Sequence, residues 1–339
     1  MLQQIKRFRP SLKHILFGSL GGSVGVLGVI FAVALYVVES IIRPKKRGLF
    51  DDYTFSPYEL NLPAESVTFP PLHGDYEVSG WFVPHPEATS TILVCPGYRT
   101  PKSDLLGISA HLWKAGHNVL AFEYYGHGKA IGIPITLGYR ETNDFLGALA
   151  YVKERVPQTR LGVMAYSMGG AIAIMCCARN SEIEALVADS AFATHWSVID
   201  YNVRRTFPLP SAPFVLTADY LMWWRARYRF SQVEPLRDIA SISPRPILLI
   251  HGGKDSIVDP HDATLLYNAA AEPKELWFLP EAGHCGAYFI DRVAYTNKVV
   301  AFFEQSLKKP RLQLVESISD DIGPVEEKVD ADENLSEAS

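Results

Sequence analysis

A serine near the middle of the chain has the surroundings of an activated nucleophile. Ser167 lies in Ala165-Tyr166-Ser167-Met168-Gly169-Gly170, between the apolar run 161–164 and the helix-forming run 171–175. A small residue two positions before a serine and a glycine two positions after it, between strand and helix, are typical of a nucleophile elbow. Such a turn strains the serine backbone and directs its hydroxyl out of the sheet, where it can attack a carbonyl carbon. Ala165 replaces the more usual first glycine and is still small enough for the turn.

A carboxylate and a histidine that could activate this serine follow later in the chain. Asp255 comes shortly after the apolar run 246–250, and His284 comes shortly after the run 276–279. Because the carboxyl ends of parallel strands meet at one edge of a sheet, we expect Ser167, Asp255 and His284 to lie together there. The predicted roles are nucleophile for the serine, general base for the histidine and orienting acid for the aspartate.

Nearby residues of the same types have other interpretations. Asp259 precedes Pro260 and a helical stretch, which is the usual place of a helix N-cap. His251, at the end of a strand-like run, is interpreted as a structural residue. Asp189, which ends the apolar run 185–188, stays open as an alternative acid.

An earlier loop has the composition expected of an oxyanion hole. Attack on a carbonyl develops negative charge on its oxygen, and each N–H fixed in advance at that oxygen lowers the barrier by about 3 kcal/mol. The N–H of Met168, directly after the serine, is one predicted donor. The N–H of Tyr98, in the loop Pro96-Gly97-Tyr98-Arg99 after the strand-like run 91–95, is the other. A simple Pro-Gly turn is the alternative for this loop.

Together these motifs resemble the α/β-hydrolase superfamily, and within it the serine-aminopeptidase-like group of serine hydrolases with a small cap and often a membrane anchor. The similarity runs from about Ser66 to about Leu307. The chain departs from the group's pattern at Pro96, where histidine is usual, at Glu123, where aspartate is usual, and at Lys129, where serine is usual. The similarity rests on residues 80–84, 96–98, 125–128, 165–170, 189–192, 246–255 and 282–284.

The resemblance implies acyl transfer through a Ser-His-Asp triad and a covalent acyl-serine, without a cofactor or metal ion. The leading interpretation is hydrolysis of an ester or thioester by an esterase-like enzyme, with a small-molecule or lipid acyl group as substrate. An acyltransferase, a peptidase and a non-catalytic scaffold of the same fold are the alternatives.

The remaining apolar runs predict the fold that positions these residues. Strands are expected near 66–70, 77–83, 91–95, 118–122, 160–165, 185–189, 246–250 and 274–279, and helices near 103–115, 141–156, 168–180, 260–271 and 291–307. After an antiparallel start this alternation predicts an α/β-hydrolase fold with a mostly parallel sheet flanked by helices. The aromatic-rich insert 193–243 interrupts the alternation and is expected to form a small helical cap over Ser167, its aromatic residues lining an acyl pocket or packing the cap onto the sheet.

Residues 17–38 contain no charged side chain and are long enough to span the roughly 30 Å hydrocarbon layer of a bilayer. A single transmembrane helix is predicted, with a cleaved signal peptide as the alternative, although its apolar region is usually only about 7–15 residues. The orientation stays open, because equal numbers of basic residues flank the span. These residues are Lys6, Arg7, Arg9 and Lys13 before it and Arg43, Lys45, Lys46 and Arg47 after it.

The expected organisation is completed by segments at both ends and by the charge distribution. A basic segment 1–16 precedes the span, a linker 39–65 leads to the hydrolase domain 66–307, and a tail 308–339 follows it. Nine acidic and four basic residues and no aromatic residue in the tail predict disorder. The chain has a net charge of −5, and the hydrolase domain has no basic excess to bind nucleic acid. The four cysteines show no disulfide or metal spacing, and the oligomeric state stays open.

Overall fold

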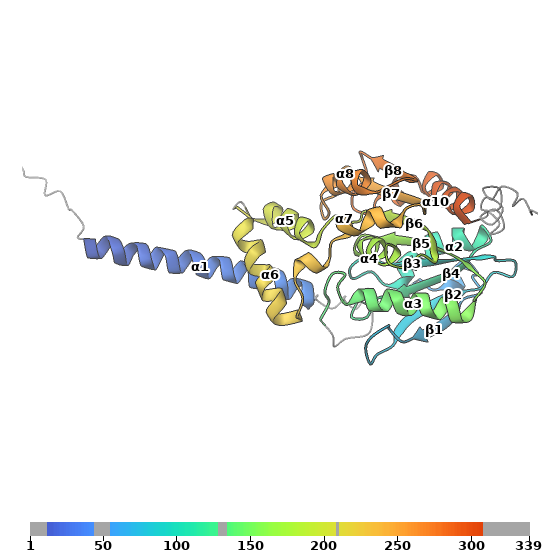
Figure 1. The fold of residues 1–339 in the computed structure, drawn as a ribbon, viewed down its shortest axis with the longest axis horizontal. Helices are drawn as coiled ribbons and strands as arrows, with labels where there is room; N and C mark the ends of the chain where they lie inside the picture. Colours follow the sequence, from blue (N-terminus) through green and yellow to red (C-terminus); the bar gives the residue numbers. More distant parts are fainter. Residues whose placement is uncertain (1–11, 44–54, 128–133, 208–209, 308–339) are drawn as a thin grey trace, which may run out of the picture. The chain divides into compact units, whose positions relative to one another are not determined.

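The computed structural model describes residues 12–43, 55–127, 134–207 and 210–307, and its eight strands form one sheet in the order β1-β2-β4-β3-β5-β6-β7-β8 (Figure 1). The strands β1 and β2 pair antiparallel, β2 pairs antiparallel with β4, and the other neighbours are parallel. The predicted mostly parallel sheet is therefore confirmed. The strands are β1 (Glu65–Phe69), β2 (Val78–Val83), β3 (Ser90–Cys95), β4 (Asn118–Glu123), β5 (Arg160–Tyr166), β6 (Ile183–Asp189), β7 (Ile247–Gly252) and β8 (Lys274–Leu279).

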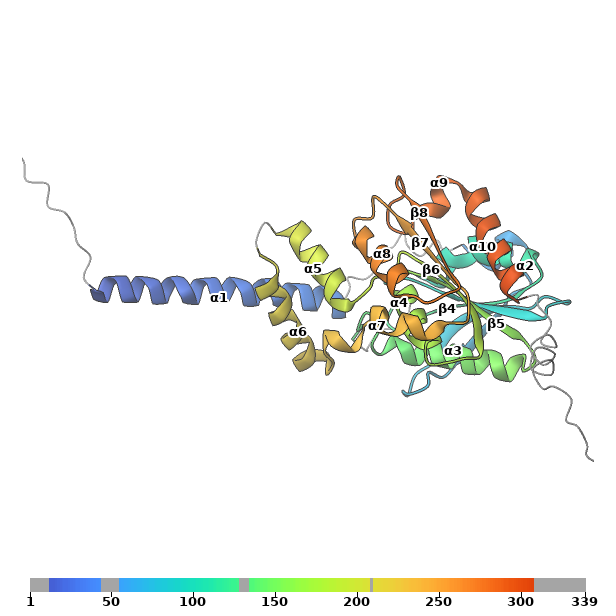
Figure 2. The ribbon, with the colours of Figure 1, turned by 45° about the horizontal axis from the view of Figure 1, so that its top comes forward.

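Helices cover both faces of the sheet because its central strands are apolar on both sides. In β3, Leu93 belongs to the core cluster on one face, while Ile92 and Val94 belong to the cluster on the other. The first face is covered by α3 (Glu141–Arg155), α4 (Met168–Cys177) and α8 (Pro260–Ala269). The second is covered by α2 (Leu106–Lys114), which follows η3 (Lys102–Leu105), and by α9 (Ala287–Ile290) and α10 (Arg292–Leu307). Figure 2 shows α3 on one side of the sheet and α2 and α10 on the other.

The insert 193–243 folds into short helices. They are α5 (His195–Thr206), α6 (Ala212–Ala226), η4 (Phe230–Gln232), α7 (Pro235–Asp238) and η5 (Ile239–Ile242). The first of them begins at a capping box, in which Thr194 Oγ1 accepts a hydrogen bond from Ser197 N at 2.9 Å.

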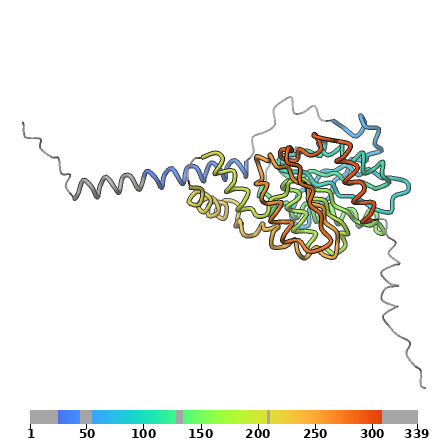
Figure 3. The backbone as a smooth tube through the Cα atoms, turned by 90° about the horizontal axis from the view of Figure 1, so that it is seen from above, coloured from blue at the N-terminus to red at the C-terminus, as the bar shows by residue number. Residues whose placement is uncertain are grey.

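The C-terminal end of the N-terminal helix α1 (Leu12–Ile42) packs against the cap. It extends four residues beyond the expected end of the span at Val38. Ala34, Val38 and Ile42 recur every four residues on one side of the helix and are buried in the core that also contains residues of α6. Figures 1 and 3 show the end of α1 beside α6. The part of the expected linker 39–65 that is described thus holds the last helical residues of α1 and the short η2 (Pro57–Leu60). Residues 1–11 of the expected basic segment and the expected tail 308–339 lie outside the described residues.

Candidate active site

The serine expected to act as nucleophile lies on a strained turn between β5 and α4. Ser167 has φ 50° and ψ −120°, a conformation that side chains larger than glycine rarely adopt. Its N–H donates to Asp189 O at 2.7 Å, which holds the turn against β6. A Cβ at Gly169 would lie 2.3 Å from Pro96 O, so only glycine fits two positions after the serine. This packing is the physical reason for the glycine in the motif.

The structure brings the three predicted catalytic residues together. His284 Nε2 lies 2.8 Å from Ser167 Oγ, and His284 Nδ1 lies 2.7 Å from Asp255 Oδ2. The ionised carboxylate only accepts hydrogen bonds, so the imidazole carries its proton on Nδ1 and leaves Nε2 free to accept the serine proton. The serine follows β5, the aspartate follows β7 and the histidine follows β8, so the three meet at the carboxyl ends of parallel strands.

Asp255 is held in place by partners on every side of its carboxylate. Its Oδ1 accepts from the N–H groups of Ile257 at 2.8 Å and Val258 at 2.9 Å, and His251 Nε2 lies 3.3 Å from its Oδ2. Burial raises the pKa of this carboxyl, but the imidazoles of His251 and His284 and the backbone N–H of Val258 outweigh it and hold the pKa well below its usual range. His251, expected to be structural, therefore contacts the acid of the predicted triad.

The two other acidic candidates make different contacts. Asp189 Oδ2 accepts from Tyr295 Oη at 2.8 Å and its Oδ1 accepts from Ser190 Oγ at 2.9 Å, so both of its oxygens are used away from the imidazole. Burial raises its pKa, although these hydrogen bonds oppose the shift. Asp259 Oδ1 accepts from His261 N at 3.0 Å and caps α8, as expected from its place before Pro260.

The expected oxyanion loop lies against the nucleophile elbow. A Cβ at Gly97 would lie 3.2 Å from Ser167 Cβ, so the glycine lets the loop backbone approach the serine closely. The N–H groups of Tyr98 and Met168 have no hydrogen-bond partner among the described residues. Two unpaired N–H groups beside a nucleophile are available to a developing oxyanion.

A cavity of about 310 Å³ opens beside Ser167 and is lined mainly by apolar side chains. From the predicted cap, α5 and Phe207 contribute to its wall, whereas Phe214 and Phe230 are buried within the cap. Most of the insert's aromatic residues thus do not line this cavity. The outer surface of α6 instead exposes Leu216, Tyr220, Trp223 and Trp224.

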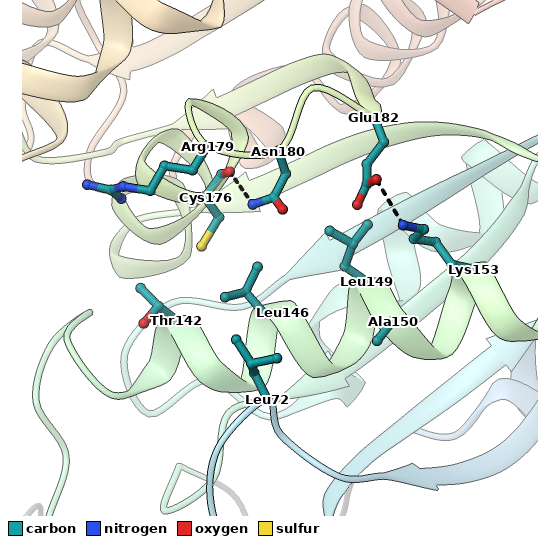
Figure 4. A pocket seen from close by; sticks show the side chains of 10 residues that line it. All are labelled: Leu72, Thr142, Leu146, Leu149, Ala150, Lys153, Cys176, Arg179, Asn180 and Glu182. Atoms are coloured by element: carbon teal, nitrogen blue, oxygen red, sulfur yellow. Dashed lines mark hydrogen bonds and ion pairs between the residues drawn. The ribbon is translucent and has the colours of Figure 1, made fainter.

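A second cavity, of about 450 Å³, lies between α3 and the end of α4 (Figure 4). Its wall is formed by leucines such as Leu146 and Leu149, and Lys153 pairs with Glu182 across it at 2.9 Å. The lining thiol of Cys176 is fully buried, and burial raises its pKa, so it stays protonated and unreactive. The residues that line this cavity include no serine or cysteine paired with a histidine, unlike the cavity at Ser167.

The described residues contain no cluster of three or more histidine, cysteine, aspartate or glutamate side chains that could hold a metal ion. All four cysteines are free thiols. Cys285, directly after His284, donates its N–H to Ser190 Oγ at 3.0 Å, which ties the histidine loop to the end of β6.

Comparison with known proteins places the fold in a family. The chain belongs to the alpha/beta hydrolase family, whose model matches residues 92–295, and this confirms the superfamily resemblance seen in the sequence. Family membership supports a hydrolase activity. The chain is 26% identical over 303 residues to the uncharacterized protein YqkD of Bacillus subtilis, covering 86% of this chain and 98% of YqkD. It is 30% identical over 264 residues to the uncharacterized protein YfhR of Salmonella typhi, covering 72% of this chain and 82% of YfhR.

Solved structures share the same fold at low sequence identity. The esterase Pf2001 of Pyrococcus furiosus matches 78% of this chain and 99% of its own with a TM-score of 0.63 and 23% identity. The acylaminoacyl peptidase of Pyrococcus horikoshii matches 75% of this chain and 43% of its own with a TM-score of 0.56 and 15% identity. At these identities the likeness establishes the architecture.

Proposed function

We propose that this protein is a serine hydrolase that cleaves an acyl ester or thioester through Ser167, His284 and Asp255. One observation carries the proposal, the continuous line of contacts from Ser167 Oγ through both nitrogens of His284 to the buried carboxylate of Asp255. The line begins at a serine on a strained turn, beside the N–H groups of Tyr98 and Met168, which have no hydrogen-bond partner among the described residues. This combination supplies nucleophile, base, orienting acid and oxyanion donors at one point.

Acylation uses each contact in turn. Ser167 Oγ attacks the carbonyl carbon of the substrate while His284 Nε2 takes the serine proton, and the carbonyl oxygen becomes an oxyanion facing the N–H groups of Tyr98 and Met168. The bond to the leaving alcohol or thiol then breaks, and the imidazolium returns the proton to the leaving group. Asp255 stabilises the imidazolium throughout, because its lowered pKa keeps it ionised.

Deacylation repeats the sequence with water. His284 Nε2 takes a proton from water as its oxygen attacks the acyl carbon, and the proton passes to Ser167 Oγ as the ester bond to the enzyme breaks. The products are a carboxylic acid and the free serine. Transfer of the acyl group to an alcohol or amine would use the same intermediate.

Labelling with a fluorophosphonate probe tests the proposal, because such probes react covalently with activated serines. We expect the full-length protein to be labelled and Ser167→Ala to lose the label completely. Ser66→Ala, at an exposed serine on β1, is the matched control and keeps the label. A folded native protein that fails to react, or a Ser167→Ala variant that reacts equally well, would rule the proposal out.

We further propose that α1 anchors the enzyme in a membrane as a single-pass helix. Its segment Gly25–Ile42 has a mean hydropathy of 2.3 and is long and apolar enough to cross a bilayer, and most of that segment is not covered by protein. The exposed Tyr220, Trp223 and Trp224 of α6 are of the types enriched at membrane interfaces. Loss of α1 as a signal peptide would remove Ala34 and Val38 from the core of the folded protein.

Alkaline carbonate extraction of membranes from expressing cells, with mass spectrometry of the N-terminal peptides, tests this anchor. We expect the protein to stay in the membrane pellet with α1 intact. The double variant Leu27→Arg/Phe31→Arg should move into the soluble fraction, because both residues lie in the middle part of the predicted span 17–38 and are exposed on α1, and an arginine there costs about 3 kcal/mol on insertion. A mature protein that begins after α1, or a native protein released by carbonate, contradicts the proposal.

A further inference from the structure

The C-terminal end of α1 forms part of the wall of the cavity at Ser167. Tyr36, Val37, Ser40 and Ile41 line the same cavity as the nucleophile. Residues 36 and 40, and likewise 37 and 41, lie one turn apart, so they form one face of the helix. That face lies beside the one through which Val38 and Ile42 pack into the core. The helix that we propose as an anchor thus also contributes to the substrate cavity.

The cap contributes α5 and Phe207 to the wall, and most of the polar side chains in the cavity already have partners within the protein. Val198, Ile199 and Val203 supply apolar surface. Of the polar side chains that line the cavity, four donate to backbone carbonyls within the protein. Ser40 donates to Tyr36 O, Tyr98 to Ser40 O and Ile41 O, Asn202 to Val198 O and Ile257 O, and Thr206 to Asn202 O. An occupant of this cavity therefore meets mainly apolar surface, which favours an apolar chain over a polar group.

Several parts of the hydrolase domain hold the end of α1 in place. Tyr98 Oη donates to the carbonyls of Ser40 and Ile41, at 3.0 Å each, and these belong to the last turn of a helix, where carbonyls lack partners within the helix. Burial raises the pKa of Tyr98 to about 12, so the hydroxyl remains a donor. Glu39 forms an ion pair with Arg225 of α6. Because Tyr98 also supplies a proposed oxyanion N–H, the helix end and the oxyanion loop form one connected unit.

Resting on the proposed function, we propose that the end of α1 and the facing side of α5 form the acyl-chain site of the enzyme. The substrate class is an ester or thioester of a medium or long apolar acyl chain. The chain lies between Val37 and Val203 while its carbonyl sits at Ser167. Such a chain is supplied either by a bilayer lipid or by a soluble acyl ester.

Hydrolysis of p-nitrophenyl esters by the full-length protein in detergent tests this site. Val37→Trp fills the cavity, and we expect kcat/KM for the decanoate to fall about 50-fold, as expected from the lost burial of about three methylenes. We expect a smaller fall for the acetate, because its short acyl group buries less apolar surface against the wall of the cavity. Val37→Ala enlarges the cavity and should shift the preference toward the palmitate.

Val29→Trp is the matched control, because Val29 lies two turns earlier on α1, is exposed and does not line the cavity. Its decanoate-to-acetate ratio should equal that of the native protein. The acyl-chain site is overturned if the native protein has a lower kcat/KM for the decanoate than for the acetate. It is also overturned if the Val37 variants keep the native ratio of these two values. If Val37→Trp loses acetate hydrolysis as well, Val37→Ala is the deciding variant. A shift of its chain-length preference toward the palmitate supports the acyl-chain site, and an unchanged preference overturns it.

The same measurements separate this inference from the proposed function. If hydrolysis depends on Ser167 but the Val37 variants do not change the chain-length preference, the serine hydrolase proposal is supported and only the acyl-chain site is wrong. Hydrolysis that persists in Ser167→Ala removes the proposed function itself. A long-chain ester presented in phosphatidylcholine vesicles is then compared with the same ester bound to albumin, to distinguish a bilayer lipid from a soluble acyl ester as the substrate. A bilayer substrate is hydrolysed faster from the vesicles. Val37→Trp lowers the rate of hydrolysis with either form of the ester.

Discussion

Replacing His284 by alanine is expected to lower kcat for p-nitrophenyl ester hydrolysis by about 10⁶-fold, the loss seen when a triad base is removed. The imidazole is the group that touches both ends of the proposed proton path, at 2.8 Å from Ser167 Oγ and 2.7 Å from Asp255 Oδ2. Without it the hydroxyl has no acceptor for its proton as it attacks. Steady-state kinetics of the full-length protein measure the loss.

His261→Ala is the matched control for this prediction. His261 is exposed at the start of α8, where its backbone rather than its ring contacts Asp259, so its removal should leave kcat within about twofold. Thermal unfolding of both variants establishes that they are folded. A folded His284→Ala protein that retains one hundredth or more of the native kcat would show that another group acts as the base.

The fold was predictable because its signals are local. Each strand of the sheet is a short apolar run between polar turns, and β3, with all six residues buried, is the extreme case. Because both faces of the central strands are covered by helices, their runs are continuous rather than alternating, and the expected strand limits differ by at most two residues from those of the structure. The two edge strands β1 and β8 are more exposed, and in β1 the apolar Val67 and Phe69 alternate with polar residues instead of forming a continuous run.

The three residues of the candidate triad were predictable for a related reason. Ser167 carries a local signal, since the close contact of Gly169 with Pro96 requires glycine in the motif. Asp255 and His284 carry no such motif, but each follows a strand, and strand ends of a parallel sheet share one edge. Sequence position relative to the strands therefore places them, without any information about distance.

The contacts of α1 with the site could not be predicted from the sequence. Tyr98 and Ser40 are 58 positions apart, and no residue type at either position indicates a hydrogen bond from a tyrosine hydroxyl to a helix-end carbonyl. The composition of an apolar segment does not distinguish a segment covered by lipid from one covered by protein. Glu39, a charge next to the expected span, is the one signal that the helix end has a protein partner, and the structure pairs it with Arg225. The contact of His251 with Asp255 could not be predicted from the sequence either, because a histidine at a strand end is most simply interpreted as a structural residue.

Asp255→Asn is expected to lower kcat by about 10⁴-fold while leaving the fold intact, since the aspartate of a triad acts by fixing the tautomer of its histidine. The amide oxygen of asparagine can still accept from the N–H groups of Ile257 and Val258, so the loop after β7 keeps its hydrogen bonds. The amide NH₂ then faces His284 Nδ1 in place of the carboxylate oxygen. With a donor on that side, the imidazole must carry its proton on Nε2, and it can no longer accept the proton of Ser167.

This prediction discriminates among the acidic residues of the site. Asp259→Asn should keep activity within about threefold, because asparagine caps a helix as well as aspartate does. Asp189→Asn alters a carboxylate bound to Tyr295 and Ser190, while the Asp189 backbone carbonyl that holds Ser167 N is unchanged, so a moderate loss is expected. If Asp189→Asn reduced kcat more than Asp255→Asn did, the orienting acid would be Asp189. If only Asp255→Asn lowers kcat strongly, and its thermal stability is that of the native protein, Asp255 is the residue that acts through the tautomer of His284.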